Sequence, residues 1–174
     1  MRQLPTEIFT AYETEALQTI VKIYVPKSSW FPNKSIFCRY AWFWTQGTGP
    51  MPAGYHIDER IQLNGLGASP YPGQGTMLNG LGNSSSITEL RLVRQDPYIS
   101  FGNIGSMMAR PFIDDSNSVT WWDKLPATGT PTDFNSAIEI DQMIYFPGTW
   151  PGATVQVTWA EAFLEQGTNL GTLA

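Results

Sequence analysis

Hydrophobic and polar positions alternate one by one in several segments of this chain, most clearly within residues 153–165. There Val155, Val157 and Trp159 fall on one side of an extended chain, and threonine and glutamine residues fall on the other. Alternation of β-branched and aromatic residues with polar ones predicts a long, half-buried β-strand. We therefore expect Val155, Val157 and Trp159 to point into the core, and this strand to complete a sheet.

Residues 35–45 form a second candidate strand, and both of its faces are largely apolar. One face carries aliphatic and aromatic residues throughout, and the opposite face carries Phe37, Arg39, Ala41 and Phe43. Two apolar faces predict a central strand, or one whose second face is covered by a loop or a neighbouring subunit. The first face comprises Ile36, Cys38, Tyr40, Trp42 and Trp44.

A third clear alternation covers residues 138–146, where isoleucines alternate with Glu139 and Asp141. We expect Ile138, Ile140 and Ile144 to lie in the core, with the two carboxylates on the other face. A shared apolar face also predicts a strand at residues 17–25, weaker patterns predict strands at 57–63 and 87–93, and short ones are expected at 98–101 and 119–122.

Helical signals are few. Residues 6–18 suit a short helix or turn, and Asp133 is placed to cap one helical turn at residues 134–137. Residues 46–56 and 64–86 are rich in glycine and proline and predict long loops. About eight strands with so little helix predict an all-β protein, an antiparallel β-sandwich of the jelly-roll kind. A chain of 174 residues suits a single domain, 1–174.

The composition points to contacts with other molecules. Charged residues make up 14% of the chain and aromatic residues 13%, whereas an ordinary soluble domain has about 25% charged residues. So few charges and so many large rings predict wide apolar surface, which marks contact with proteins or ligands. The alternative is a surface of serine, threonine, asparagine, glutamine and glycine, as in many secreted β-proteins.

The charge pattern argues against nucleic-acid and membrane partners. The net charge is −5 and the ten basic residues are scattered, so we expect no direct binding to a phosphate backbone. No apolar stretch is long enough to span a membrane. Residues 1–25 contain three glutamates and no long apolar core, so we expect no secretory signal.

Catalytic motifs are missing from the sequence. His56 is the single histidine and would have to serve in any Ser-His-Asp or Cys-His arrangement, yet no Gly-x-Ser-x-Gly motif occurs. Cys38 is the single cysteine, so no internal disulfide forms and a zinc site lacks ligands. We expect no enzyme activity, no cofactor, no catalytic role for His56, and a core position for Cys38.

Two carboxylate patterns leave alternatives open. Asp114, Asp115 and Asn117 lie within four residues and could hold calcium on a loop, although they are also ordinary turn residues and we predict no metal. The pairs Glu139/Asp141 and Glu161/Glu165 share strand faces. A glycosidase uses two carboxylates, but such pairs more simply mark solvent or interface faces.

Aromatic residues beside turns are the remaining candidates for a site. Trp30, Trp121, Trp122 and Trp150 are the tryptophans that we expect to be exposed, because each flanks a turn rather than lying within a strand. Exposed rings of this kind would form a subunit contact or a platform on which sugars stack. The alternative is that most of the tryptophans lie in the sandwich core.

At its C-terminal end the pattern resembles capsid proteins of small icosahedral viruses. The resemblance rests on Val155-Gln-Val-Thr-Trp-Ala-Glu-Ala-Phe-Leu-Glu165 as a final jelly-roll strand, preceded by a strand at residues 138–146. It implies long loops on a particle surface and location in the virion. Many such proteins carry a basic N-terminal arm, whereas Arg2 is the only basic residue before Lys22. The resemblance therefore implies a projecting domain, or a shell protein whose genome contacts lie elsewhere.

Two classes of function follow from these observations. The first is a structural capsid or coat protein, whose partners are copies of itself or other capsid subunits. The second is a glycan-binding β-sandwich module that uses exposed aromatic residues. The two overlap, because a projecting capsid domain can bind a host receptor or glycan.

Overall fold

The computed structural model describes residues 1–14, 16–50, 52, 56–64, 66–77, 84–96, 98–108, 123–125, 132–146 and 148–165. These residues contain twelve β-strands and no helix, so the all-β class is confirmed. The strands are β1 (Arg2–Leu4), β2 (Thr6–Ile8), β3 (Thr10–Tyr12), β4 (Gln18–Val25), β5 (Ser35–Thr45), β6 (His56–Leu63), β7 (Leu66–Met77), β8 (Ser84–Gln95), β9 (Tyr98–Met108), β10 (Asp123–Leu125), β11 (Ile138–Tyr145) and β12 (Thr154–Leu164).

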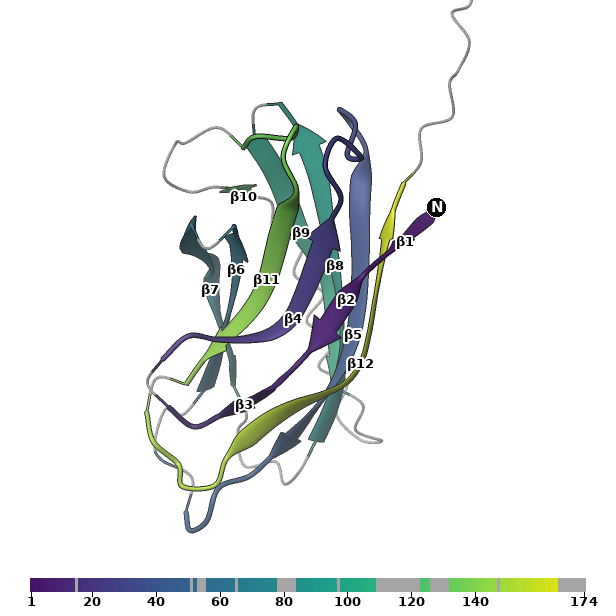
Figure 1. The fold of residues 1–174 in the computed structure, drawn as a ribbon. Coiled ribbons are helices and arrows are strands. Elements are labelled where there is room, and N and C mark those ends of the chain that lie inside the picture. The colour runs from purple at the N-terminus through teal and green to yellow at the C-terminus, as the bar shows by residue number, and fades with distance from the viewer. Residues whose placement is uncertain are drawn as a thin grey trace, which may run out of the picture.

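The strands form two antiparallel sheets that lie face to face (Figure 1). The seven-stranded sheet has the order β1-β12-β5-β8-β9-β10, with β3 also paired to β12. The five-stranded sheet has the order β2-β4-β11-β6-β7. The predicted antiparallel β-sandwich is therefore confirmed. The pairs β6–β7 and β8–β9 are hairpins that each stay within one sheet.

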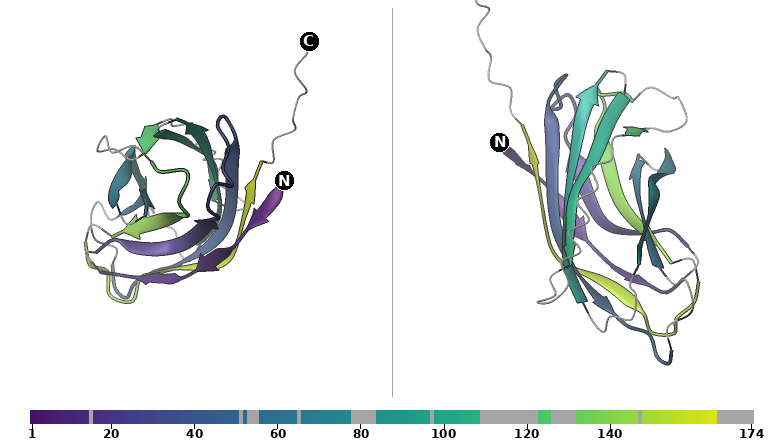
Figure 2. Two further views of the ribbon diagram at one scale, coloured as in Figure 1. Left: turned by 45° about the horizontal axis from the view of Figure 1, so that its top comes forward. Right: turned by 180° about the vertical axis from the view of Figure 1, so that it is seen from behind.

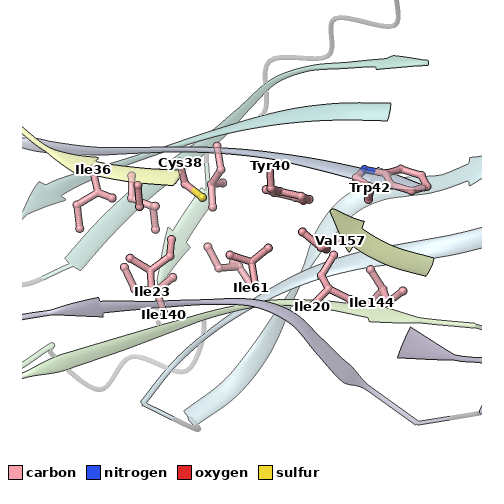
Figure 3. Close-up of a cluster of buried hydrophobic side chains, with 14 of the residues drawn as sticks. Ile20, Ile23, Ile36, Cys38, Tyr40, Trp42, Ile61, Ile140, Ile144 and Val157 are labelled. Atoms are coloured by element: carbon pink, nitrogen blue, oxygen red, sulfur yellow. The ribbon is translucent and has the colours of Figure 1, made fainter. Parts of the chain in front are cut away.

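The core lies between the two sheets, which Figure 2 shows from two further directions. In Figure 3, Ile36, Cys38 and Tyr40 of β5 face Ile23, Ile140 and other isoleucines of the opposite sheet. β5 lies between β12 and β8, so the prediction of a central strand at residues 35–45 is confirmed. Burial also confirms the predicted core positions Ile138, Ile140, Ile144, Val155 and Val157.

Trp159 does not point into the core, and this expectation was wrong. β12 contains a β-bulge, because Val157 pairs with Trp42 whereas Trp159 pairs with the next β5 residue, Ala41. Thr158 is the extra residue. A bulge of one residue exchanges the two faces of the strand beyond it. The Trp159 side chain consequently lies on the outer face of the seven-stranded sheet and is 41% exposed.

Three other expectations need correction. The described residues between 6 and 18 form no helix but contain β2 and β3, which pair with β4 and β12. The predicted loop at residues 64–86 contains β7, and β9 extends well beyond residue 101. Asp133 caps no helix; its carboxylate instead accepts hydrogen bonds from Asn135 N (3.0 Å) and Ser136 Oγ (2.6 Å) in a turn. The strand predicted at residues 119–122 lies outside the described residues.

Asn64 forms the turn between β6 and β7. Its φ of 49° lies in the left-handed region, which asparagine tolerates better than most residues. The same residue bonds the end of β11, because Asn64 N donates to Glu139 O (2.9 Å) and Glu139 N donates to Asn64 Oδ1 (2.7 Å). This turn therefore joins the hairpin to its neighbouring strand.

Candidate functional site

The tryptophans predicted to be exposed are buried wherever the structure describes them. Trp30 is 1% exposed and Trp150 is 3% exposed, so neither forms a surface platform. Trp121 and Trp122 lie outside the described residues. The physical reason is that turns close the two ends of a sandwich, and a large ring beside such a turn covers the end of the core.

Trp30 closes one end, in the connection between β4 and β5. Its ring meets Phe134 edge to face at 5.7 Å, and its Nε1 donates to Lys34 O at 2.7 Å. The Arg94 guanidinium lies over the Phe134 ring at 4.0 Å and also donates to Trp30 O. Backbone, ring and guanidinium thus fix this turn together.

Trp150 closes the opposite end, in the connection between β11 and β12. Its ring lies 6.0 Å from Trp44, which in turn stacks on Phe146 at 6.1 Å. A Cβ atom at Gly47 would lie 2.5 Å from the Trp150 ring, so only glycine fits at that position. The indole is a structural element of the core rather than a binding residue.

Large exposed side chains gather instead on the outside of the seven-stranded sheet. We call this surface the outer apolar face. Its most exposed members are Ile87 (45%), Trp159 (41%) and Phe43 (36%), on three neighbouring strands. Half-buried apolar residues of the same strands complete it. The full set is Phe37, Ala41, Phe43, Ile87, Trp159 and Phe163.

The pairing of the strands arranges the outer apolar face in rows. Ala41 pairs with Trp159 on one side and with Ile87 on the other, which makes a continuous apolar row across β12, β5 and β8. Residues directly opposite in an antiparallel pair lie about 4.5–5.5 Å apart, so these side chains are neighbours. Phe37 on β5 and Phe163 on β12 are also directly opposite each other, two rows from Ala41 on the same face.

One charged row crosses this surface. Arg39 pairs with Glu161 on β12 and with Glu89 on β8. Its Nη2 lies 2.5 Å from Glu89 Oε1, and its guanidinium lies 5.5 Å from the Phe37 ring. The positive charge of Arg39 is therefore matched within the row, so the surface can meet an apolar partner at a smaller desolvation cost than an unpaired charge would impose.

The described residues show no arrangement for nucleophilic or metal chemistry. Cys38 is fully buried, and burial raises the pKa of its thiol to about 12, which keeps it protonated and unreactive. His56 opens β6, and its side chain lies outside the described part of the structure. No group of three metal-binding side chains and no bilayer-spanning helix occurs among the described residues. Asp114, Asp115 and Asn117 fall outside them.

The carboxylate pair on β11 belongs to an ion-pair network. Lys22 Nζ on β4 lies 2.9 Å from Glu139 Oε1 and 3.7 Å from Asp141 Oδ1. Asp141 is buried rather than exposed, and burial raises its pKa, although Lys22 opposes this effect. Of the other pair, Glu161 lies on the outer face, whereas Glu165 follows β12 and accepts hydrogen bonds from Ser35.

This network predicts a pH-dependent stability. Because the folded protein binds the Asp141 proton more tightly than the unfolded chain does, ionisation destabilises the fold as the pH rises from about 3.9, the usual aspartate pKa, to the raised value. Asp141→Asn removes that ionisation. We expect its free energy of unfolding, measured by urea denaturation, to rise relative to the wild type across this window.

Asp133→Asn serves as the control with the opposite sign. Hydrogen bonds from Ser136 and Asn135 lower the pKa of Asp133, so its charged form stabilises the fold. The variant should lose stability relative to the wild type as the pH rises toward the usual aspartate pKa. If the free energies of unfolding of the two variants changed with pH in the same direction relative to the wild type, the pKa directions given for Asp141 and Asp133 would be contradicted.

Comparison with known proteins adds little to this description. No protein-family model matches the chain, and no curated protein matches it in sequence. One similar solved structure is peanut lectin with a 9mer peptide, at 7% identity and a TM-score of 0.41, covering 95% of this chain and 91% of that chain.

Proposed function

We propose that this chain is a structural subunit, a capsid or coat protein of a virion, that contacts other copies of itself through the outer apolar face. The observation that carries the proposal is the row Trp159, Ala41 and Ile87, whose two large side chains are both more than 40% exposed. The cores of protein interfaces are rich in aromatic residues and poor in charge, as this row is.

The architecture supports the same proposal. The outer face of a sheet offers one continuous surface, and assemblies of identical subunits repeat one such interface many times. The resemblance of the C-terminal strands to capsid proteins supports a virion as the assembly. The row Glu161, Arg39 and Glu89 has two carboxylates for one guanidinium, and this negative excess disfavours a polyanion as the partner.

A matched pair of isoleucines tests the proposal. Ile87 on the outer apolar face is 45% exposed, and Ile8 on β2 of the other sheet is 43% exposed. Sedimentation velocity should show the wild type as an oligomer or particle. Ile87→Lys should shift it to the monomer, because a lysine charge would lie in the interface, whereas Ile8→Lys should leave assembly unchanged. A wild type that stays monomeric at high concentration would refute the proposal.

A glycan-binding module remains the second candidate. Since Trp30 and Trp150 are buried, this function would depend on Trp159, whose exposed indole offers a flat apolar ring. It would show as a strictly monomeric protein in which an oligosaccharide changes the tryptophan fluorescence of the wild type and not that of Trp159→Ser.

A further inference from the structure

An open hollow of about 520 Å³ lies at the Trp30 end of the sandwich. Figure 1 shows that β1 and the end of β12 lie beside each other at the end where β4 connects to β5. The volume of the hollow falls within the range of roughly 300–1,000 Å³ that is usual for small-molecule sites. The hollow is lined by Arg2, Pro26, Lys27, Ser28, Ser29, Phe31, Leu164 and Glu165.

Positive charge is concentrated around this hollow although the chain as a whole is acidic. Arg2 and Lys27 line it, and Lys34 and Arg91 lie close enough to stabilise the charged form of Glu165. These are four of the ten basic residues in a chain of net charge −5. Such a local excess of cations raises the local concentration of anionic ligands.

Glu165 is the one carboxylate in the lining, and its hydrogen bonds hold it in place. Its Oε2 accepts hydrogen bonds from Ser35 N (3.1 Å) and Ser35 Oγ (2.7 Å), which hold the pKa of Glu165 below its usual range. Arg91 Nη2 lies 3.4 Å from the same Ser35 hydroxyl. Arg2 and Lys27 form no salt bridge among the described residues, and Lys27 lies near enough to Asp133 to stabilise the charged form of that carboxylate.

Part of the lining of the hollow is a turn that hydrogen bonds hold in place. Ser29 donates to Pro26 O through its backbone N (3.2 Å) and through its Oγ (2.6 Å). Ser28 has a φ of 54°, a left-handed conformation, and its Oγ donates to Asn135 O at 3.4 Å. A turn fixed in this way offers its hydroxyl groups in one geometry, which reduces the ordering cost of binding.

Phe31 supplies an apolar ring beside these polar groups. It is 58% exposed, although aromatic rings of this size usually bury most of their surface. An exposed ring, two cations and two hydroxyl groups are complementary to a sugar ring that carries an acidic group. The ring covers the apolar face of the sugar, the cations bind its acid, and the hydroxyls meet its own hydroxyl groups.

We infer that this hollow binds an acidic saccharide through Arg2, Lys27 and Phe31. None of the residues that line the hollow belongs to the outer apolar face, although Glu165 also lies beside Phe37 and Phe163 of that face. Different variants therefore test the binding and the proposed assembly. A single-stranded nucleic acid fits less well, because the net charge of −5 repels a polyanion.

The test is an NMR titration of the labelled full chain with 3′-sialyllactose, with lactose as the uncharged control. We expect shifts in the backbone amides of residues 27–31 with sialyllactose only. Lys27→Met keeps the length of the side chain but removes its charge, and Phe31→Leu removes the ring. Each should weaken binding about tenfold. Lys124→Met, in β10 at the opposite edge of the sheet from β1, should leave binding unchanged.

Four outcomes would overturn the inference. The first is that sialyllactose leaves the amides of residues 27–31 unmoved, and the second is that lactose shifts them equally. The third is that free sulfate competes as well as the saccharide, which would reduce the site to a simple anion site. The fourth is that a single-stranded oligonucleotide binds there more tightly than the saccharide. Unchanged thermal unfolding of Lys27→Met and Phe31→Leu would establish that weaker binding arises in the hollow itself.

Discussion

Replacing Trp44 with alanine should lower the free energy of unfolding by about 3–5 kcal/mol, the usual cost of removing a fully buried aromatic side chain. Trp44 on β5 has no exposed surface, and it lies between the rings of Phe146 and Trp150. Its removal leaves a cavity at the end of the core that the surrounding rings cannot fill. Urea denaturation followed by circular dichroism measures the change.

Trp159→Ala is the matched control, because Trp159 lies on the adjacent strand β12 but on the outer face. With 41% of its surface exposed, its removal should cost about 1 kcal/mol or less. Equal losses for the two variants at a concentration where the protein is monomeric would mean that the bulge is misplaced and that Trp159 lies inside.

Deletion of Thr158 should prevent stable folding. Without the extra residue, one half of β12 must exchange its inward-facing and outward-facing side chains. Turning the first half exposes Val155 and Val157, at a cost of about 1.5–3 kcal/mol for each side chain. Turning the second half brings Glu161 into the core, where an unpaired carboxylate costs more than a hydrophobic contact returns. Either loss is large against a total stability of about 5–15 kcal/mol.

Thr158→Ala keeps the bulge and should change stability little. It removes only the hydrogen bond from Thr158 Oγ1 to Ala41 O, which is long at 3.3 Å and exposed to solvent. Loss of the cooperative thermal transition in the deletion variant, with the transition kept in Thr158→Ala, is the expected result. A deletion variant that unfolds at the wild-type temperature would show that the bulge is dispensable.

Alternation alone predicted the strands that have one buried face. In β11 the isoleucines could be assigned to the core directly from the sequence, as the buried Ile138 and Ile140 show. In β5 both faces are apolar, so alternation separated Ile36 from Phe37 without showing which of them faces the core. Short edge strands such as β2 carry no such signal. Their side chains are mostly exposed, so pairing with β4 decides their conformation.

The sequence around β12 contains evidence for the bulge, in the positions of the glutamates beyond Val157. If the period of two continued beyond Val157, Glu161 and Glu165 would share the inner face with Trp159, while Ala162 and Leu164 would face outward. Two carboxylates in the core are costly, whereas a shift by one residue buries Ala162 and Leu164 instead. Weighing that cost would have placed Trp159 on the outer face.

The turn tryptophans could not be assigned from the sequence in the same way. A ring beside a turn is exposed if the turn lies over solvent and buried if the turn folds over the end of the sandwich, and no local pattern separates the two. The position of Trp30 depends on Phe134 and Arg94, which are distant in the chain. Only the assembled sandwich brings these residues together.

The pairing of β12 also governs when the protein can fold during its synthesis. β12 lies between β1 and β5 in the sheet, and it contacts β5 over its whole length, from Thr154 opposite Thr45 to Leu164 opposite Ile36. Until the ribosome has released residues 154–164, β5 lacks a neighbour on one edge, and β1 and β3 have no strand to join. The apolar strands of the nascent chain therefore stay uncovered until residues that are far apart in the sequence can pair. During this interval chaperones would have to protect the chain.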